Sequence, residues 1–335
     1  MKFKYLLIIF CTLTAIQACK NDIAINAPYK ETPIVNGFLD IGVDTQYIKI
    51  TKTFQNASNL SPQQAAQDAS IMYFDTLIVK MVRLSTNDTL TFYKTNNIPK
   101  DSGYFTNSVN FLYALPYKFD DPDKINSAYK LIIYNPKSGN TYTSQTSIVG
   151  GTTIMPHNSA GSPYKLDIFY DPNIPNYIQF EWNPVPSAYI YTALIRYYYT
   201  ENSLQKSADE YIAINDVDKK VYPETYFFNF KSDQMNQFLI NYFGRRDTAD
   251  HSVYRKITEI DYVVLSGSND LLTAVDLSKP NTSLLQVKPD FSNIQGGLGL
   301  FTSRSTSSLI VPFDLLTPYS SEKNLTINVK GFAQP

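Results

Sequence analysis

The sequence predicts a mainly β protein, with a β-sandwich over residues 32–150 and a second β-rich domain over residues 151–335 that carries one or two short helices. Composition is the first reason, because the 335-residue chain contains 26 Tyr and 20 Phe, and aromatic side chains favour strands. The second reason is that short stretches of alternating apolar and polar residues recur along the chain, separated by Pro, Gly and Asn. The length is sufficient for two domains with separate cores.

The first residues depart from this pattern and predict a secretory signal. Lys2 and Lys4 precede a short, nearly uniform apolar run over residues 5–18, which is typical of a signal peptide that is removed. A helix that crosses a bilayer needs about 20 apolar residues, so this run is too short to span a membrane. We therefore expect residues 1–18 to be absent from the mature protein.

The end of the apolar run indicates how the mature chain is anchored. Ile16, Gln17, Ala18 and Cys19 resemble the bacterial lipobox, in which an aliphatic residue and a small residue precede the cysteine that receives a lipid. Gln17 departs from the small residue that is usual at its position, and Ile16 does not suit ordinary signal cleavage after Ala18. The sequence thus predicts lipidation at Cys19, with residues 19–31 as a polar, lipidated tether.

Cysteine usage agrees with this interpretation. The chain has two cysteines, and Cys11 lies in the predicted signal peptide, so the mature protein keeps only Cys19. A single cysteine excludes an intramolecular disulfide and a thiolate metal cluster. We expect the protein to contact a membrane through the lipid on Cys19 and to fold outside the cytoplasm.

Strands are predicted throughout residues 32–150. Apolar and polar residues alternate over residues 46–53, and Pro136 and Gly139 lie in a turn between two further stretches. The predicted strands are residues 33–40, 46–53, 76–84, 89–94, 129–134 and 141–146. Residues 56–69 lack periodicity and are expected to form a loop or a single helical turn. This density of short strands predicts a sandwich.

Residues 149–163, which are rich in Gly and Pro, form the predicted domain boundary. Beyond it, a strand over residues 177–182 ends in Trp182, and a Pro-rich turn leads into a strand over residues 189–199. This layout is similar to that of fibronectin type III domains, in which the Trp belongs to the core. We therefore expect a fibronectin-III-like domain. Its other predicted strands are residues 261–265, 307–313 and 324–330.

Alternate residues of the strand over residues 189–199 form an aromatic stripe. Such a stripe is more often a packed sheet face than a sugar-binding surface, yet it is the best aromatic candidate in the chain. The candidate aromatic binding face consists of Tyr189, Tyr191, Tyr197 and Tyr199.

One helix is predicted over residues 232–243. Ser232 can cap its start, and Gly244 ends it. Apolar residues follow at helical spacing within it: Met235, Phe238, Leu239 and Tyr242. A second short helix is expected over residues 269–277.

The segment near residue 295 resembles a known signature. Seven of its residues match the pattern S-N-I-x-G-G-x-G-x-F, namely Ser292, Asn293, Ile294, Gly296, Gly297, Gly299 and Phe301. The pattern is similar to one near the C-terminus of an uncharacterised lipoprotein family of the Bacteroidota, domain of unknown function 4249. Residues 32–37 and 129–133 are similar to other parts of that family, whereas residues 56–69 look like an insertion.

This resemblance implies an outer-membrane lipoprotein with an immunoglobulin-like N-terminal part. Members of the family are often found beside TonB-dependent receptors, so the resemblance implies an outer-membrane receptor or transporter as a partner. It carries over no catalytic residue. Whether the anchored domains face the periplasm or the cell surface stays open.

The sequence lacks the usual motifs for catalysis, metals and cofactors. Only His157 and His251 are available, which argues against a histidine triad or a histidine metal site. The glycines at residues 296–299 lack the lysine and the spacing of nucleotide-binding loops. The acidic cluster at residues 120–123 lacks the spacing of a calcium loop, so a solvated loop is favoured. We expect no metal and no cofactor.

Charge and chemistry leave two function classes open. A net charge of −1 predicts no binding to nucleic acid. The first class is a non-enzymatic binding or assembly lipoprotein, and the missing catalytic sets favour it. The second is a carboxylate-based glycan hydrolase on the same anchor, which would need only two carboxylates facing each other across a cleft.

Overall fold

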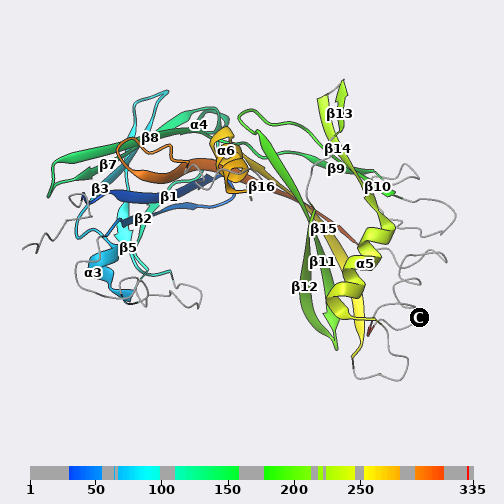
Figure 1. Ribbon diagram of the computed structural model, residues 1–335. Coiled ribbons are helices and arrows are strands. Elements are labelled where there is room, and N and C mark those ends of the chain that lie inside the picture. Colours follow the sequence, from blue (N-terminus) through cyan, green and yellow to red (C-terminus); the bar gives the residue numbers. More distant parts are fainter. Residues whose placement is uncertain are drawn as a thin grey trace, which may run out of the picture.

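The computed structural model describes residues 30–54, 64, 67–98, 110–157, 177–212, 218–221, 224–245, 253–279, 291–312 and 330–331. Within these residues the protein is mainly β, which confirms the predicted fold class. Two sandwiches lie side by side, the N-terminal one on the left of Figure 1 and the second on the right. The predicted signal peptide and Cys19 lie outside the described residues.

The first sandwich has two layers of four strands. One layer contains β1 (Pro33–Asp40), β2 (Thr45–Lys52), β6 (Leu112–Pro116) and β5 (Tyr93–Thr95), in that order. The facing layer contains β4 (Thr89–Thr91), β3 (Ile78–Arg83), β7 (Ala128–Asn135) and β8 (Asn140–Ser147). These are the A-B-E-D and C′-C-F-G orders of immunoglobulin domains. The immunoglobulin-like sandwich expected from the family resemblance is therefore present.

Apolar side chains at alternate positions hold the two layers together. The residues with almost no exposed surface are Val35, Leu39, Ile48 and Ile50 in one layer and Val79, Met81, Leu131 and Ile133 in the other. Burying one such side chain contributes about 1.5–3 kcal/mol relative to leaving it exposed. The alternation over residues 46–53 thus correctly predicts which face of β2 is buried.

A hydrogen bond of Tyr129 stabilises the turn, or corner, between β6 and β7. Its hydroxyl donates to the carbonyl oxygen of Lys124, 3.1 Å away, and lies 3.2 Å from the hydroxyl of Tyr117. The corner is the short helix α4 (Pro122–Ile125), which Asp121 caps by accepting the N–H of Lys124 at 2.7 Å. A tyrosine that bonds back to this corner is a recurrent feature of immunoglobulin sandwiches.

The single strand predicted over residues 89–94 is wrong, because the chain changes layers at Phe92. β4 pairs with β3 in one layer, whereas β5 pairs with β6 in the other. Phe92 lies between them with its side chain in the core, and its N–H donates to the carbonyl of Val79 at 2.9 Å. Both short strands keep the same local pattern, so periodicity alone does not reveal the crossing.

The second sandwich repeats the topology of the first. One layer contains β13 (Asp218–Val221), β14 (Glu224–Lys231), β10 (Tyr177–Trp182) and β9 (Ile154–His157), in that order. The other contains β12 (Leu204–Ile212), β11 (Ile190–Glu201), β15 (Arg255–Gly267) and β16 (Leu298–Pro312). These are again the D-E-B-A and C′-C-F-G orders, the sandwich architecture that fibronectin type III domains share.

Two helices lie in the connections of the second sandwich, as predicted. Helix α5 (Ser232–Phe243) has the predicted bounds, and α6 (Asn269–Ser278) extends one residue beyond its prediction. Trp182 is fully buried in the core, where its ring lies 5.7 Å from that of Tyr191. A further short helix, α3 (Ala69–Met72), belongs to the first sandwich and lies against β2.

The long strand β16 belongs to both sandwiches. Residues 298–304 pair in parallel with β1, and residues 304–312 pair in antiparallel fashion with β15. The β1 layer of the first sandwich and the β15 layer of the second thereby merge into one eight-stranded sheet. Its strand order is β12-β11-β15-β16-β1-β2-β6-β5. Figure 1 shows β16 in orange, crossing from one sandwich to the other. The predicted strand over residues 307–313 is only its second half, and the one over residues 324–330 lies almost entirely outside the described residues.

Candidate functional site

The signature residues near residue 295 bind the start of β16 to the first sandwich. The side-chain amide of Asn293 donates to the carbonyl of Phe301 at 2.7 Å and accepts the N–H of Phe301 at 2.9 Å. Asn293 thus takes the place of a neighbouring strand for one residue of β16. The ring of Phe301 is fully buried in the core of the first sandwich, next to Gly37.

Gly299 allows β16 to lie directly against β1. Its φ is +100°, and a Cβ built there would lie 2.0 Å from the carbonyl oxygen of Val35. Only glycine combines this backbone conformation with so close an approach. The role of Gly299 is therefore a close backbone contact with β1.

The same segment also reaches the opposite layer. The N–H of Gln295 donates to the carbonyl of Thr143 on β8 at 2.8 Å, and the Thr143 hydroxyl donates to Oε1 of Gln295 at 2.8 Å. Ile294 is buried in the core between the two layers. The segment therefore closes the side of the first sandwich between β1 and β8. The signature residues have a structural role, which the resemblance had left unassigned.

Three serines on one face of β16 attach the linker between the sandwiches. The hydroxyl of Ser303 accepts the N–H of Val149 at 3.0 Å, and that of Ser307 accepts the N–H of Thr152 at 2.8 Å. Between them, the Ser305 hydroxyl donates to the carbonyl of residue 150 at 2.6 Å. The predicted boundary region is thus hydrogen-bonded along β16, which restricts movement of one sandwich against the other.

A polar cleft of about 290 Å³ lies where the two sandwiches meet. Its lining residues come from β8 of the first sandwich and from the turn before β11 and the start of α6 in the second. They are Gln145, Thr146, Ser147, Ser187, Tyr189, Ser268, Asn269 and Asp270. Clefts between domains are frequent positions for small-molecule sites, and we take this one as the candidate functional site.

The signature segment and the cleft are physically connected. Asn293 donates to Oδ2 of Asp270 at 2.8 Å with the same amide nitrogen that bonds Phe301. Ser268 caps α6 by accepting the N–H of Leu271, and its own N–H donates to the carbonyl of Ser303 at 3.2 Å. The start of α6, and with it the carboxylate of Asp270, is therefore held against β16.

The candidate aromatic face is not one surface. Tyr197 and Tyr199 are buried in the core of the second sandwich, where their rings pack on Phe238 and Phe243 of α5. Tyr191 is partly buried beside Trp182, and only Tyr189, with 62% of its surface exposed, lies in the cleft. The reason is that β11 is an inner strand of the sheet whose face α5 covers, whereas Tyr189 precedes the strand.

The acidic cluster at residues 120–123 forms ion pairs and a helix cap. Lys124 Nζ lies 2.5 Å from Asp120 and 3.5 Å from Asp121, and Asp121 also caps α4. Among the described residues, no group of three or more His, Cys, Asp or Glu side chains has the geometry of a metal site. His157 lies at the end of β9, and His251 lies outside the described ranges.

Tyrosines with perturbed pKa values lie in the cores, away from the cleft. Burial raises the pKa of Tyr113 to about 12, and burial likewise raises the pKa of Tyr129 and that of Tyr262 well above the ordinary value. Each of these side chains belongs to a hydrophobic core cluster. Their shifts are thus consequences of packing and mark no catalytic group.

Sequence reasoning did not find most of the cleft. Its one signal was Tyr189, at the start of the aromatic stripe. Gln145 lies in the strand predicted over residues 141–146 and Asp270 in the helix predicted over residues 269–277, and no motif distinguishes either residue from its neighbours. Residues so far apart in the chain share a site only because β16 joins the two sandwiches.

Comparison with known proteins identifies no relative of the chain. No protein-family model matches the chain, and no curated protein is detectably similar to it. The family resemblance of the signature residues stays a prediction. Across the ranges that the structure describes, no helix is long and apolar enough to cross a membrane.

Proposed function

We propose that the protein is a lipid-anchored, outer-membrane lipoprotein with a non-enzymatic binding or assembly role. The observation that carries this proposal is Cys19. It follows an apolar run of signal-peptide length, it completes a lipobox with Ile16, Gln17 and Ala18, and it is the only cysteine left after cleavage. The acylated Cys19 attaches the mature chain to the membrane.

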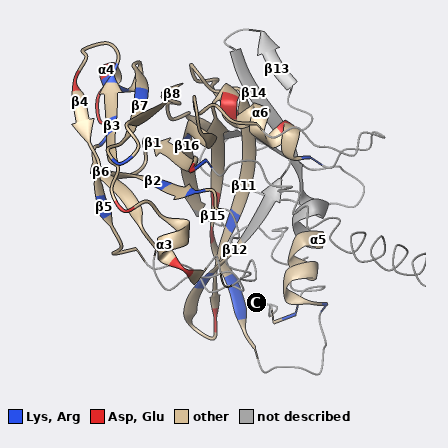
Figure 2. Cartoon of the chain, turned by 60° about the vertical axis from the view of Figure 1, so that its left-hand side comes forward, with Lys and Arg blue, Asp and Glu red and all other residues tan. Residues whose placement is uncertain are grey.

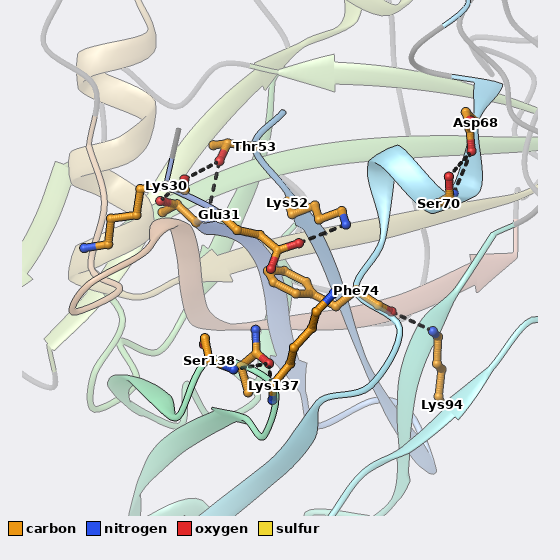
Figure 3. A network of polar contacts seen from close by, with 12 residues as sticks. Lys30, Glu31, Lys52, Thr53, Asp68, Ser70, Phe74, Lys94, Lys137 and Ser138 are labelled. Atoms are coloured by element: carbon orange, nitrogen blue, oxygen red, sulfur yellow. Dashed lines mark hydrogen bonds and ion pairs between the residues drawn. The ribbon is translucent and has the colours of Figure 1, made fainter. Parts of the chain in front are cut away.

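The entry of the tether into the fold supports this role. Glu31 Oε1 lies 2.9 Å from Lys52 Nζ, and Thr53 exchanges hydrogen bonds with Thr32. The hydroxyl of Thr53 also donates to the carbonyl of Lys30 at 3.3 Å, so the chain is fixed to the end of β2 as it enters β1 (Figure 3). When extended, residues 19–31 reach at most about 45 Å.

The shared strand supports a display function. β16 starts beside Ile34, close to the tether, and its 15 residues extend over about 50 Å at roughly 3.3 Å per residue. The second sandwich therefore lies at the opposite end of β16 from the attachment point (Figure 1). In this arrangement the lipid holds the first sandwich near the bilayer, and the cleft and the second sandwich extend away from it.

The surface features favour recognition of a protein or a neutral ligand. Basic and acidic residues alternate along the described elements that Figure 2 shows. β12 is the last strand of the eight-stranded sheet, and no described strand pairs with its outer edge. An open edge of this kind can accept a strand of a partner. The family resemblance suggests an outer-membrane receptor or transporter as that partner.

A hydrolase is less well supported. Glycosidases use two carboxylates about 5–10 Å apart, whereas Asp270 is the single carboxylate among the described residues that line the cleft. That carboxylate already accepts a hydrogen bond from Asn293. We therefore propose a binding role and not hydrolysis.

Replacing the lipidated residue tests the anchor. We expect Cys19→Ser to lose labelling by a fatty-acid analogue and to move from the membrane to the soluble fraction, whereas Cys11→Ser, inside the signal peptide, should still be labelled. Labelled, membrane-bound Cys19→Ser protein would overturn the anchor. Purification after mild detergent extraction then tests docking, and the absence of any reproducible outer-membrane partner would count against it.

A further inference from the structure

We propose that the cleft between the two sandwiches binds a small neutral saccharide, such as the end of a glycan chain. In this proposal Tyr189 stacks on the apolar face of a sugar ring, and Asp270, Asn269 and Gln145 hydrogen-bond its hydroxyl groups. The inference deepens the proposed binding role and rests on it. It names the ligand class, which the anchor and the fold do not.

The aromatic group comes from Tyr189. Its N–H donates to the carbonyl of Gly267 at 2.8 Å, so its backbone is fixed to the end of β15, while most of its side chain is exposed. A tyrosine ring offers an apolar face with a polar group at one end. A sugar ring, with C–H groups on its faces and hydroxyls at its edge, matches both properties.

The polar groups match adjacent hydroxyls. An ionised carboxylate only accepts hydrogen bonds, whereas each side-chain amide offers both a donor and an acceptor. With Oδ2 of Asp270 bonded to Asn293, its second oxygen remains to accept from a ligand. The amides of the exposed Gln145 and Asn269 can both donate and accept. Neighbouring hydroxyl groups of a sugar also donate and accept hydrogen bonds, so they can pair with all three side chains.

The charge and the volume of the cleft narrow the class of ligand further. Asp270 is the only charged residue among the lining residues, so the cleft disfavours phosphates, sulfates and acidic sugars. Its volume of about 290 Å³ lies just below the roughly 300–1,000 Å³ of ligand pockets. One or two sugar rings are the appropriate size.

The walls of the cleft are fixed before a ligand arrives. Ser303, Ser305 and Ser307 attach the linker to β16, and Asn293 attaches Asp270 to the same strand. Binding therefore requires little ordering of the protein, which favours affinity for a small ligand. Asn293 acts as a positioning residue for Asp270 and has no contact with the ligand itself.

A glycan array probed with the detergent-purified full chain tests the proposal. We expect binding to neutral oligosaccharides, and titration calorimetry with the strongest of them should show about tenfold weaker binding for Tyr189→Ala and for Asp270→Asn. Tyr189→Phe should keep most of the affinity. Tyr254→Ala is the matched control, because Tyr254 is similarly exposed but lies beside the far end of β15.

The proposal would be overturned if the protein bound no neutral glycan or preferred acidic glycans. It would also be overturned if Tyr189→Ala and Asp270→Asn left the affinity unchanged while circular dichroism showed both variants to be folded. Because the protein is probed in detergent, attachment to a membrane does not affect this measurement. Failure of the anchor and failure of the saccharide site are thus distinguished.

Discussion

Arg304 and Asp40 pair twice, once through the backbone and once through the side chains. They are register partners in the parallel ladder between β16 and β1, and Arg304 Nε lies 3.2 Å from Asp40 Oδ2. Arg304 is also the register partner of Gly267 on β15. The ion pair therefore lies at the residue where the shared strand passes from the first sandwich to the second.

The two members of this pair should contribute unequally to stability. Arg304 has more than half of its side chain exposed, so Arg304→Ala should cost less than about 1 kcal/mol. Asp40 is buried and also accepts the N–H of Gly42 at 2.9 Å, so Asp40→Ala should cost about 1–3 kcal/mol. Urea denaturation measures both, and equal losses would contradict the assignment.

Two glycines with positive φ should respond differently to alanine. Gly299→Ala places a Cβ against the Val35 carbonyl and should cost more than about 3 kcal/mol, since backbone and not a flexible side chain must move. Gly139 has φ +71° and nothing within 4 Å of its Cβ position, so Gly139→Ala should cost only about 1–2 kcal/mol. Thermal unfolding of the two variants makes the comparison.

The shared strand predicts that the sandwiches unfold together. Trp182 is the only tryptophan, and it is buried in the second sandwich, so its fluorescence reports that sandwich alone. Gly299 lies in the first. We expect Gly299→Ala to lower the midpoint of the Trp182 transition and of circular dichroism equally. An unshifted fluorescence midpoint would mean that the sandwiches are independent.

The corner at Tyr129 should be sensitive to loss of one hydroxyl. Tyr129→Phe leaves the buried ring in place but removes the donor to Lys124, which should cost about 1–3 kcal/mol. Tyr134→Phe on the same strand changes a more exposed side chain and should be near neutral. Chemical denaturation compares the two, and similar midpoints would show that the corner bond contributes little.

Buried tyrosines should limit stability at high pH. Burial raises the pKa of Tyr113 to about 12, whereas a tyrosine in an unfolded chain has a pKa of about 10. Above pH 10 the unfolded state thus binds fewer protons than the folded one, and stability falls as pH rises towards 12. Tyr113→Phe should flatten this fall in urea midpoints, and Tyr93→Phe, at an exposed site, should not.

Much of the local structure follows from the sequence. The alternation over residues 46–53 correctly predicts β2, and the periodicity and Gly244 correctly predict the bounds of α5. Trp182 is buried as expected. The misjudged elements are those in which a partner overrides the local pattern, such as Phe92, which the chain turns into the core as it changes layers.

The chain by itself determined many of its strands, the buried face of β2, the helix at residues 232–243 and the prediction of lipid at Cys19, because these depend on neighbouring residues. Only the tertiary structure decided that β16 pairs with β1, 264 residues away, and that Tyr189 meets Asp270 in one cleft. The physical reason is that backbone hydrogen bonds are the same for every residue. Alternation therefore specifies which face of a strand is buried, but it leaves the neighbouring strand to the packing of the whole chain.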